Sequence, residues 1–290
     1  MDTQRASRTA VIVCQARAAA NGRFATDRFA DPVAIALLHS DEQVVVRQVR
    51  TGVPPRTWAD RVEFETVRAA ADVIVPRTVT IDDAVRARAA SQLVILGAGL
   101  DDRAWRMPEL AGVDVFEVDH PASQADKRDR VGDLQPLARS VRFVAVDFSR
   151  DQLAPGLASA GHQSQIATTW IWEGVVTYLR RHEVAATLRA IRERSTDGSR
   201  LIVNYQTMTL STFLGRMIAR AMAATARRRS PWADEPVRSS WTAGTMSNLL
   251  ATQGFRVSRD ENMFAVASDL TMPVRQRQSL RSGRVAIADL

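Results

Sequence analysis

Two glycines and one aspartate stand at a spacing that suits the binding of a nucleoside-containing cofactor. An apolar run over residues 93–96 leads into Gly97 and Gly99, which allow the backbone to turn sharply and to approach a ligand closely. Asp119 follows 22 residues after Gly97, at the end of the next apolar run, where a carboxylate can accept hydrogen bonds from ribose hydroxyls. The pattern predicts a strand, a tight turn and a helix that together hold a nucleoside.

The two residues after the turn help to separate the possible cofactors. A dinucleotide-binding fingerprint places a third glycine or an alanine at position 102, where the helix N-terminus meets a pyrophosphate. Here Asp101 and Asp102 stand at the start of the helix, and their carboxylates would repel a pyrophosphate. S-adenosylmethionine has no phosphate and carries a cationic sulfonium and ammonium, so we expect it rather than NAD. Both acids could instead serve only to cap the helix.

Five short apolar runs, separated by helical patterns, indicate the sheet that must position these residues. The runs cover residues 92–96, 113–119, 141–147, 166–172 and 200–205, and helical patterns cover residues 103–110 and 181–195. This alternation predicts an α/β fold with a mostly parallel sheet, and nearly continuous apolar runs fit strands that are buried on both faces. We expect residues 263–267 and 284–288 to add an antiparallel pair that closes the sheet.

The first 76 residues show helical rather than strand patterning. Helical spacing covers residues 9–23, 31–38 and 58–71, whereas residues 43–49 fit either a helix or a strand. We therefore expect an N-terminal helical cap over residues 1–76, followed by the sheet domain over residues 77–290. Residues 207–242 interrupt the alternation and contain a helical pattern over residues 212–226, so we expect a lid insertion there.

Composition and charge exclude several classes of protein and leave one alternative open. Cys14 is the only cysteine, which excludes an internal disulfide and a cysteine-built metal site. Apolar runs are too short to span a membrane and the N-terminus is polar, so we expect a cytoplasmic protein. The net charge of +7 is compatible with RNA binding, but the arginines are spread along the chain and cluster only at residues 227–229. Nucleic acid is therefore not the expected partner.

The segments VILGAGLDDRAWR (residues 94–106) and FEVDHP (residues 116–121) resemble the leucine carboxyl methyltransferase family. The resemblance is strongest to its actinobacterial branch of S-adenosylmethionine-dependent methyltransferases. Further similar motifs are Arg77-Thr78, VDF at residues 146–148 and WEGV at residues 172–175, and the resemblance extends over residues 9–258. It implies a Rossmann-like class I methyltransferase fold with a seven-stranded, mostly parallel sheet.

The resemblance also implies roles at the amino-acid end of the cofactor. Arg77 is similar to the arginine that grips the cofactor carboxylate, for which a bidentate guanidinium is well suited. Glu173, at the end of the fourth strand, would face the ammonium, and Gly97 and Gly99 would pack their backbone against the methionine part. The lysine that eukaryotic members hold near the cofactor has no counterpart, because Lys127, the only lysine, lies elsewhere in the sequence. A protein-leucine substrate is therefore not implied.

At the nucleoside end the resemblance implies four further contacts. Asp119 would accept hydrogen bonds from both ribose hydroxyls, and His120 would lie near the adenine. Asp147 would accept a hydrogen bond from the adenine amino group, with Phe148 beside the base.

We find no convincing general base at a strand end, and we assign no catalytic residue. A carboxylate acceptor is already ionised at neutral pH and needs no base, whereas an alcohol would need one within reach. We predict an S-adenosylmethionine-dependent O-methyltransferase that acts on a carboxylate or hydroxyl of a small molecule, such as the polyketide-type metabolites that the resemblance suggests. An RNA methyltransferase and a non-catalytic S-adenosylmethionine-binding protein remain alternatives. His39, His162 and His182 are expected at the surface.

Overall fold

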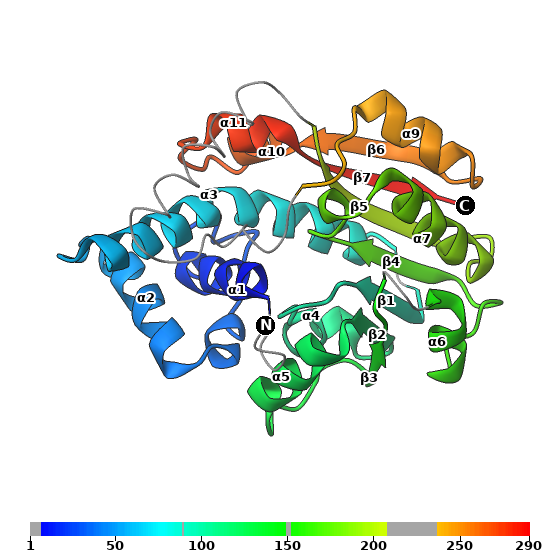
Figure 1. Cartoon of the computed structure of the whole chain (residues 1–290), viewed down its shortest axis with the longest axis horizontal. Coiled ribbons are helices and arrows are strands. Elements are labelled where there is room, and N and C mark those ends of the chain that lie inside the picture. Colours follow the sequence, from blue (N-terminus) through cyan, green and yellow to red (C-terminus); the bar gives the residue numbers. More distant parts are fainter. Residues whose placement is uncertain (1–6, 89, 149–151, 208–236) are drawn as a thin grey trace.

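The computed structural model describes residues 7–88, 90–148, 152–207 and 237–290 (Figure 1). Seven strands form one sheet in the order β3-β2-β1-β4-β5-β7-β6. Their bounds are β1 Gln92–Leu96, β2 Asp114–Asp119, β3 Ser140–Ala145, β4 Thr168–Trp172, β5 Arg200–Gln206, β6 Arg256–Asn262 and β7 Gly283–Asp289. The expected α/β fold with a seven-stranded, mostly parallel sheet is confirmed.

Strands β1 to β5 run parallel to one another. The strand order reverses at β1, because β2 and β3 lie on one side of it and β4 and β5 lie on the other. β1 pairs with β2 on one side and with β4 on the other, both in parallel register. A reversal of strand order of this kind opens a crevice at the carboxyl ends of the central strands, where open α/β sheets bind their ligands. The glycine-rich turn follows β1 directly and therefore lies at this crevice.

The closing antiparallel pair differs from the one expected from the sequence. β7 does pair antiparallel with β5 and β6, but β6 covers Arg256–Asn262. The expected strand at residues 263–267 is instead part of the helix α10 (Met263–Asp269). β6 is an edge strand whose residues are half-buried or exposed, so its charged sequence RVSRDEN lacks the apolar signal of a buried strand.

Helices cover both faces of the sheet, as predicted. Leu93 and Ile95 of β1 pack on the face covered by the N-terminal helices, α10 and α11 (Arg277–Ser282). Val94 and Leu96 face the opposite side, against α6 (Leu153–Ser159), α7 (Arg181–Glu193) and α9 (Ala243–Ala251). Both alternating sets are fully buried, because a parallel strand in the centre of such a sheet has no solvent-facing side.

The N-terminal part is helical, with two departures from the expected elements. It comprises α1 (Arg8–Ala20), the 3-10 helix η1 (Ala34–Leu37), α2 (Ser40–Thr51) and α3 (Trp58–Arg86). The helix expected over residues 31–38 is only the short η1, and the Asp31 carboxylate accepts a hydrogen bond from the Ala34 amide at its start, at 2.9 Å. The ambiguous residues 43–49 are helical within α2.

The helix α3 extends beyond residue 71, where the helical pattern in the sequence ends. It includes Pro76 in its interior, and the expected boundary between residues 76 and 77 therefore lies inside one helix (Figure 1). Proline removes one backbone donor, but nearly all residues from Ile74 to Val85 are buried against the sheet, and this packing keeps the helix continuous.

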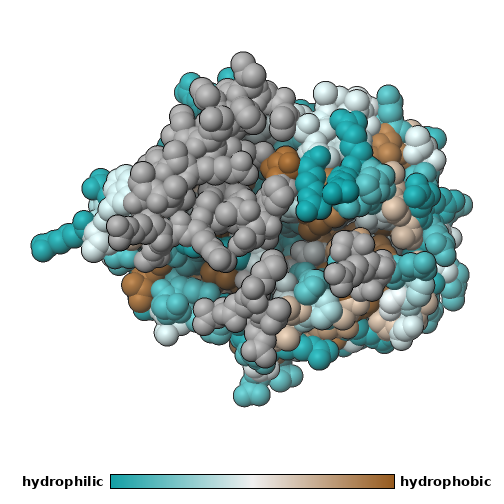
Figure 2. Space-filling view, viewed as in Figure 1, coloured by the Kyte–Doolittle hydropathy of each residue, from teal (hydrophilic) through white to brown (hydrophobic). Residues whose placement is uncertain are grey.

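The expected lid helix at residues 212–226 lies outside the described residues. The described residues on the face seen in Figure 2 are mainly hydrophilic, with scattered hydrophobic residues. Within the described part of the chain, no helix is both long and apolar enough to cross a lipid bilayer.

Candidate cofactor-binding site

A cavity of about 230 Å³ lies at the carboxyl ends of β1, β2, β4 and β5, where the sheet topology predicts a ligand site. Five of the eight residues proposed from the sequence line it: Arg77, Gly97, Gly99, Asp119 and Glu173. The remaining lining residues come from α1 and the residue before it, β1, the glycine-rich turn, α5 (Pro121–Val131), the segment after β4, and β5: Ser7, Thr9, Ala10, Val13, Arg17, Ile95, Ala98, Leu100, Asp101, Ser123, Gly174, Val175, Thr177, Tyr178, Asn204 and Gln206.

The glycine-rich turn needs glycine for two separate reasons. Gly97 and Gly99 have φ values of +66° and +51°, a backbone region that L side chains rarely adopt. A Cβ at Gly97 would lie 2.2 Å from the Val175 Cγ2, and one at Gly99 would lie 3.1 Å from the Ala10 Cβ. The turn is therefore packed between the segment after β4 and the helix α1, and it presents bare backbone to the cavity.

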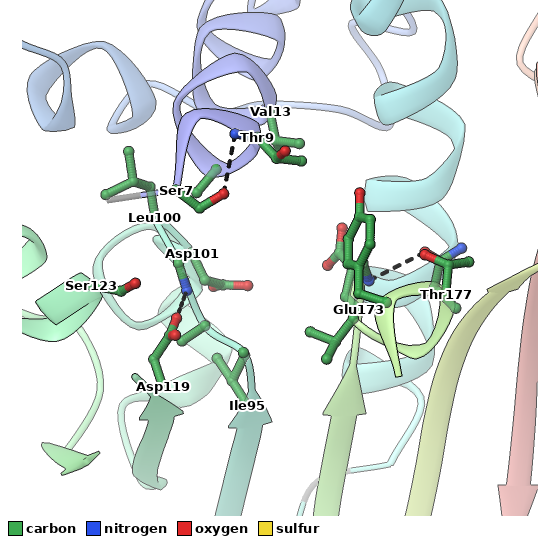
Figure 3. Close-up of a pocket in the computed structure, with 18 of the residues that line it drawn as sticks. Ser7, Thr9, Val13, Ile95, Leu100, Asp101, Asp119, Ser123, Glu173 and Thr177 are labelled. Atoms are coloured by element: carbon green, nitrogen blue, oxygen red, sulfur yellow. Dashed lines mark hydrogen bonds between the residues drawn. The ribbon is translucent and has the colours of Figure 1, made fainter. Parts of the chain in front are cut away.

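Asp119 ends β2 on one side of the cavity and is tied to the turn. Its Oδ2 accepts a hydrogen bond from the Gly99 amide at 2.5 Å (Figure 3). Its Oδ1 accepts one from the His120 amide at 2.7 Å. Burial raises the pKa of this carboxyl, and the two amide hydrogen bonds oppose that shift. Each carboxylate oxygen has a further lone pair, so the side chain can accept hydrogen bonds from a ligand as well.

Glu173 and Arg77 form an ion pair on the opposite side of the cavity, with Glu173 seen across from Asp119 in Figure 3. The Arg77 Nε lies 2.6 Å from the Glu173 Oε1, and the two side chains are 13% and 14% exposed. Burial would raise the pKa of Glu173, but Arg77 and Arg103 outweigh it and lower the pKa to about 2. Glu173 is therefore a carboxylate at any physiological pH.

Behind this pair lies a buried network of arginines and carboxylates. Arg103, which begins the short helix α4 (Arg103–Arg106), donates from Nη1 to the Glu173 Oε2 at 3.0 Å. Its Nε donates to the Asp82 Oδ1 at 2.7 Å, and Nη1 also pairs with Asp101. Arg106 contacts Asp82 too, at 2.7 Å, but among the described residues it forms no hydrogen bond or ion pair with Glu173.

Asp102 is oriented away from the cavity and into this network. Its Oδ1 accepts a hydrogen bond from the Arg106 Nε at 2.8 Å, and its Oδ2 lies 3.3 Å from the Arg17 Nη2. The side chain is 1% exposed, and burial together with the neighbouring Asp31 carboxylate raises its pKa to about 6, although Arg17 and Arg106 oppose the shift. The expectation that this acid faces the cofactor and would repel a phosphate is therefore corrected for Asp102, while Asp101 does line the cavity.

Lys127 lies closer to the site than its place in the sequence indicates. It belongs to α5 (Pro121–Val131) and is fully buried beneath the glycine-rich turn. Its ammonium donates to the Asp101 carbonyl at 2.6 Å and to the Glu117 carboxylate at 2.5 Å. The only lysine thus supports the turn from behind, although it does not line the cavity.

Three of the eight proposed residues are near the site without lining the described cavity: His120, Asp147 and Phe148. His120 is exposed, and its Nδ1 accepts a hydrogen bond from the Ala122 amide at 3.3 Å, which caps α5. Asp147 and Phe148 are half-buried after β3, and Phe148 packs against the core beside the sheet. Their contacts with an adenine stay a prediction.

The sequence did not indicate that α1 forms a wall of the cavity. Ser7, Thr9, Ala10, Val13 and Arg17 all line it, yet α1 is rich in alanine and buried on several sides, so its pattern reveals no functional face. Two further lining residues had a usable signal. Asn204 and Gln206 lie at the carboxyl end of β5, the edge at which parallel strands present their ligand-binding residues.

One of the three histidines expected at the surface is buried. His162 is 3% exposed, its Nε2 lies 3.0 Å from the Thr168 Oγ1, and Arg194 Nη2 lies 3.2 Å from its Nδ1. Because a guanidinium can only donate, Nδ1 accepts and Nε2 carries the proton. The residue is a core histidine of the α6 side of the sheet and not part of the cavity. Among the described residues no cluster could hold a metal ion.

A family model described as leucine carboxyl methyltransferase matches residues 10–192, which is more than half of the chain. The chain belongs to the leucine carboxyl methyltransferase family. The family membership inferred from the motifs around Gly97 and Asp119 is thereby confirmed, and the matched range contains all eight proposed site residues.

Curated relatives of this family member occur in actinobacteria. A protein of Streptomyces coelicolor, named as a candidate S-adenosyl-L-methionine-dependent methyltransferase, is 38% identical over 61% of this chain and 62% of its own length. A similarly named protein of Frankia alni is 36% identical over 67% of this chain and 66% of its own length. The matched part spans about 60% of the length of these relatives.

Solved structures support the fold of this family member. A DUF574 family protein of Streptomyces avermitilis matches with a TM-score of 0.53 at 13% identity, over 94% of this chain and 96% of its own. A structure from Thermobifida fusca, named as a candidate methyltransferase, matches with a TM-score of 0.51 at 15% identity, over 88% and 91%. The class I methyltransferase fold is confirmed.

Proposed function

We propose that this protein binds S-adenosylmethionine and transfers its methyl group to an oxygen of a small molecule. The observation that carries the proposal is the placement of Asp119 and the Arg77–Glu173 pair on opposite sides of one cavity. S-adenosylmethionine has a ribose at one end and a zwitterionic amino acid at the other. One carboxylate for the hydroxyls and one pair of opposite charges for the zwitterion match both ends.

The residues present fit this cofactor at three points. Asp119 would accept hydrogen bonds from ribose hydroxyls with the lone pairs that the Gly99 and His120 amides leave open. Glu173 would accept from the ammonium and Arg77 would donate to the carboxylate. Gly97 and Gly99 line the cavity with bare backbone, which a ligand can approach closely, and a Cβ at Gly97 would press against Val175 of the same cavity wall. The family and the names of the relatives favour the same cofactor.

When bound, S-adenosylmethionine supplies an electrophilic methyl group on a sulfonium. The protein's contribution is to hold the two reactants in line, since such a displacement depends strongly on proximity and orientation. The three carboxylates that line the described cavity already have partners: Glu173 pairs with two arginines, Asp119 accepts from two backbone amides, and Asp101 pairs with Arg103. No histidine is among the described lining residues. This arrangement favours an acceptor that arrives ionised, such as a carboxylate or an acidic hydroxyl.

We infer that the acceptor binds beside Thr177, Tyr178 and Gln206. These residues line the same cavity, and Thr177 lies beside Glu173 on the side opposite Asp119 (Figure 3). They offer neutral hydroxyl and amide groups, which suit a small polar function on a larger molecule. A polyketide-type metabolite remains our preferred class of acceptor, and the wide spread of arginines along the chain does not favour RNA.

Transfer of a labelled methyl group tests the proposal. The protein is incubated with S-adenosylmethionine carrying a labelled methyl group and with either a panel of phenolic and carboxylic small molecules or transfer RNA. Label in a small-molecule ester or ether, found by mass spectrometry, is the expected result. Label in RNA alone would replace the proposal by an RNA methyltransferase, and cofactor binding without transfer to any acceptor would leave only a binding protein.

A further inference from the structure

We infer that Arg103 is a positioning residue that keeps the Glu173 carboxylate charged and aimed into the cavity while Arg77 is occupied by ligand. The inference rests on the proposed function, because it assigns Glu173 and Arg77 to the two charged groups of the cofactor's amino acid. Nothing in the family match or in the names of the relatives assigns a role to Arg103.

The two oxygens of Glu173 have different partners. Oε1 pairs with Arg77 at 2.6 Å, and Arg77 lines the cavity. Oε2 accepts from the Arg103 Nη1 at 3.0 Å, and Arg103 is 3% exposed and does not line the cavity. A ligand can therefore compete for Arg77 but cannot reach Arg103. When the cofactor carboxylate accepts hydrogen bonds from Arg77, Arg103 remains as the fixed partner of Glu173.

Arg103 is itself held in place on all sides. Its Nε donates to the Asp82 Oδ1 of α3 at 2.7 Å, and Asp101 pairs with its Nη1 and accepts from its backbone amide at 2.9 Å. These contacts fix the orientation of the planar guanidinium group, and its Nη1 therefore holds the Glu173 carboxylate in one orientation. A carboxylate in this buried position without a fixed cation would be costly and would tend to take up a proton.

Arg106 provides an internal comparison within the same helix. It is equally buried, with 3% of its side chain exposed, and it also binds Asp82. Its other carboxylate partner at hydrogen-bond distance is Asp102, which faces away from the cavity. A merely structural role in the network would be shared by Arg103 and Arg106, whereas a role in orienting Glu173 belongs to Arg103 alone.

The charged groups that face Glu173 come from three elements. They are Arg77 of α3, Arg103 of α4 and Arg17 of α1. Burial has the largest effect on the pKa of Glu173 and raises it, and the three arginines lower it, with Arg77 contributing most and Arg17 least. Loss of Arg103 should therefore raise the pKa of Glu173 and make cofactor affinity fall as the pH is lowered, because a protonated carboxyl no longer attracts an ammonium.

Calorimetric titration with S-adenosylhomocysteine, which keeps the amino-acid end, between pH 5 and pH 8 tests this inference. For Arg103→Gln we expect affinity to fall about tenfold at pH 7 and further toward pH 5, while the wild type and Arg106→Gln give flat profiles. Arg103→Lys retains the positive charge and serves as the second variant if Arg103→Gln does not fold. Its affinity for S-adenosylhomocysteine should be reduced but independent of pH. In a Glu173→Gln background, Arg103→Lys should change affinity less than twofold.

Three results would overturn the inference while the wild type still binds S-adenosylhomocysteine. They are an unchanged affinity in the Arg103 variants, equal losses in Arg103→Gln and Arg106→Gln, or a loss in Arg103→Lys of the same size with and without Glu173. Absence of binding to the wild type would overturn the proposed function itself, so the two failures are distinguishable.

Discussion

At the scale of single residues, a glycine-rich turn, two strand-end acids and a buried network of arginines form and support the cavity. Gly97, Gly99 and Asp119 each stand at the end of an apolar run, and this local pattern is sufficient to predict a nucleoside-binding turn from the sequence. Arg103 and Asp82 are 21 positions apart, and their ion pair exists only because α3 packs against α4. With 39 basic residues in the chain, no spacing singles out Arg17 and Arg77, which line the cavity, or Arg103 and Arg106, which lie behind it.

The variant Gly97→Ala tests the close packing of the turn. The added Cβ would lie 2.2 Å from the Val175 Cγ2, so the turn or the segment after β4 must shift, at a cost of about 1–3 kcal/mol. We expect the free energy of unfolding to fall by at least that amount and the affinity for S-adenosylhomocysteine to fall roughly tenfold or more, because the bare backbone faces the cavity. Urea unfolding and calorimetry measure the two effects.

Gly198→Ala is the matched control for Gly97→Ala. Gly198 also has a positive φ, +86°, but its nearest contact to an added Cβ is the Ala167 Cβ at 3.6 Å, and it does not line the cavity. Backbone strain of about 1–2 kcal/mol is therefore common to both variants, while the loss of affinity should appear only at Gly97. Equal affinities for the two variants would show that the turn does not approach the ligand.

At the scale of the elements, buried strands were recognised and the exposed edge was not. β1 and β4 are nearly all apolar because helices cover both of their faces, so composition alone identifies them. β6 is held by its backbone pairing with β7, which leaves side chains such as Arg256 and Asp260 exposed or half-buried and free to be polar. The apolar residues 263–267 were taken for a strand because a short apolar run does not distinguish a strand from a helix.

His162, buried between β4, α6 and α7, should make the stability of the protein depend on pH. Burial, with a smaller effect of Arg194, lowers the pKa of His162 from 6.5 to about 4. The unfolded chain therefore binds a proton that the folded protein excludes between these values, so stability is full above pH 6.5 and decreases as the pH falls toward 4. The expected loss is about 2–3 kcal/mol.

Urea unfolding of His162→Gln at pH 7 and pH 4.5 measures this contribution. The variant should lose less stability than the wild type over this range, because a glutamine does not titrate. His182→Gln, which replaces an exposed histidine of α7, should retain the slope of the wild type. A variant of His162 with the slope of the wild type would mean that another group excludes the proton.

At the scale of the whole molecule, the helical N-terminal part and the sheet are joined more closely than the sequence indicated. The helix α3 runs through the expected boundary at residue 76, and α1 contributes both to the core against the sheet and to the core among the N-terminal helices. Arg17 of α1 also donates to the Leu100 carbonyl in the glycine-rich turn at 2.7 Å. The helical cap thus forms part of the cavity.

Limited proteolysis tests this continuity. Cleavage needs an exposed backbone that can leave its hydrogen bonds, and residues 72–86 are helical and mostly buried. We expect no stable fragment with an N-terminus in this range under native conditions, as judged by mass spectrometry of the products. Accumulation of a folded fragment that begins near residue 77 would instead support two separable domains.

Binding of S-adenosylhomocysteine compared with NAD tests the central claim most directly. At a hundredfold excess over the dissociation constant, a ligand that binds the folded state alone stabilises it by about 2.7 kcal/mol, which corresponds to a rise in Tm of roughly 4–5 °C for a chain of 290 residues. We predict this rise for S-adenosylhomocysteine and none for NAD. Asp119→Ala should lower the affinity by about 1–3 kcal/mol, since the ribose hydroxyls lose their acceptor. A rise with NAD alone would contradict the account.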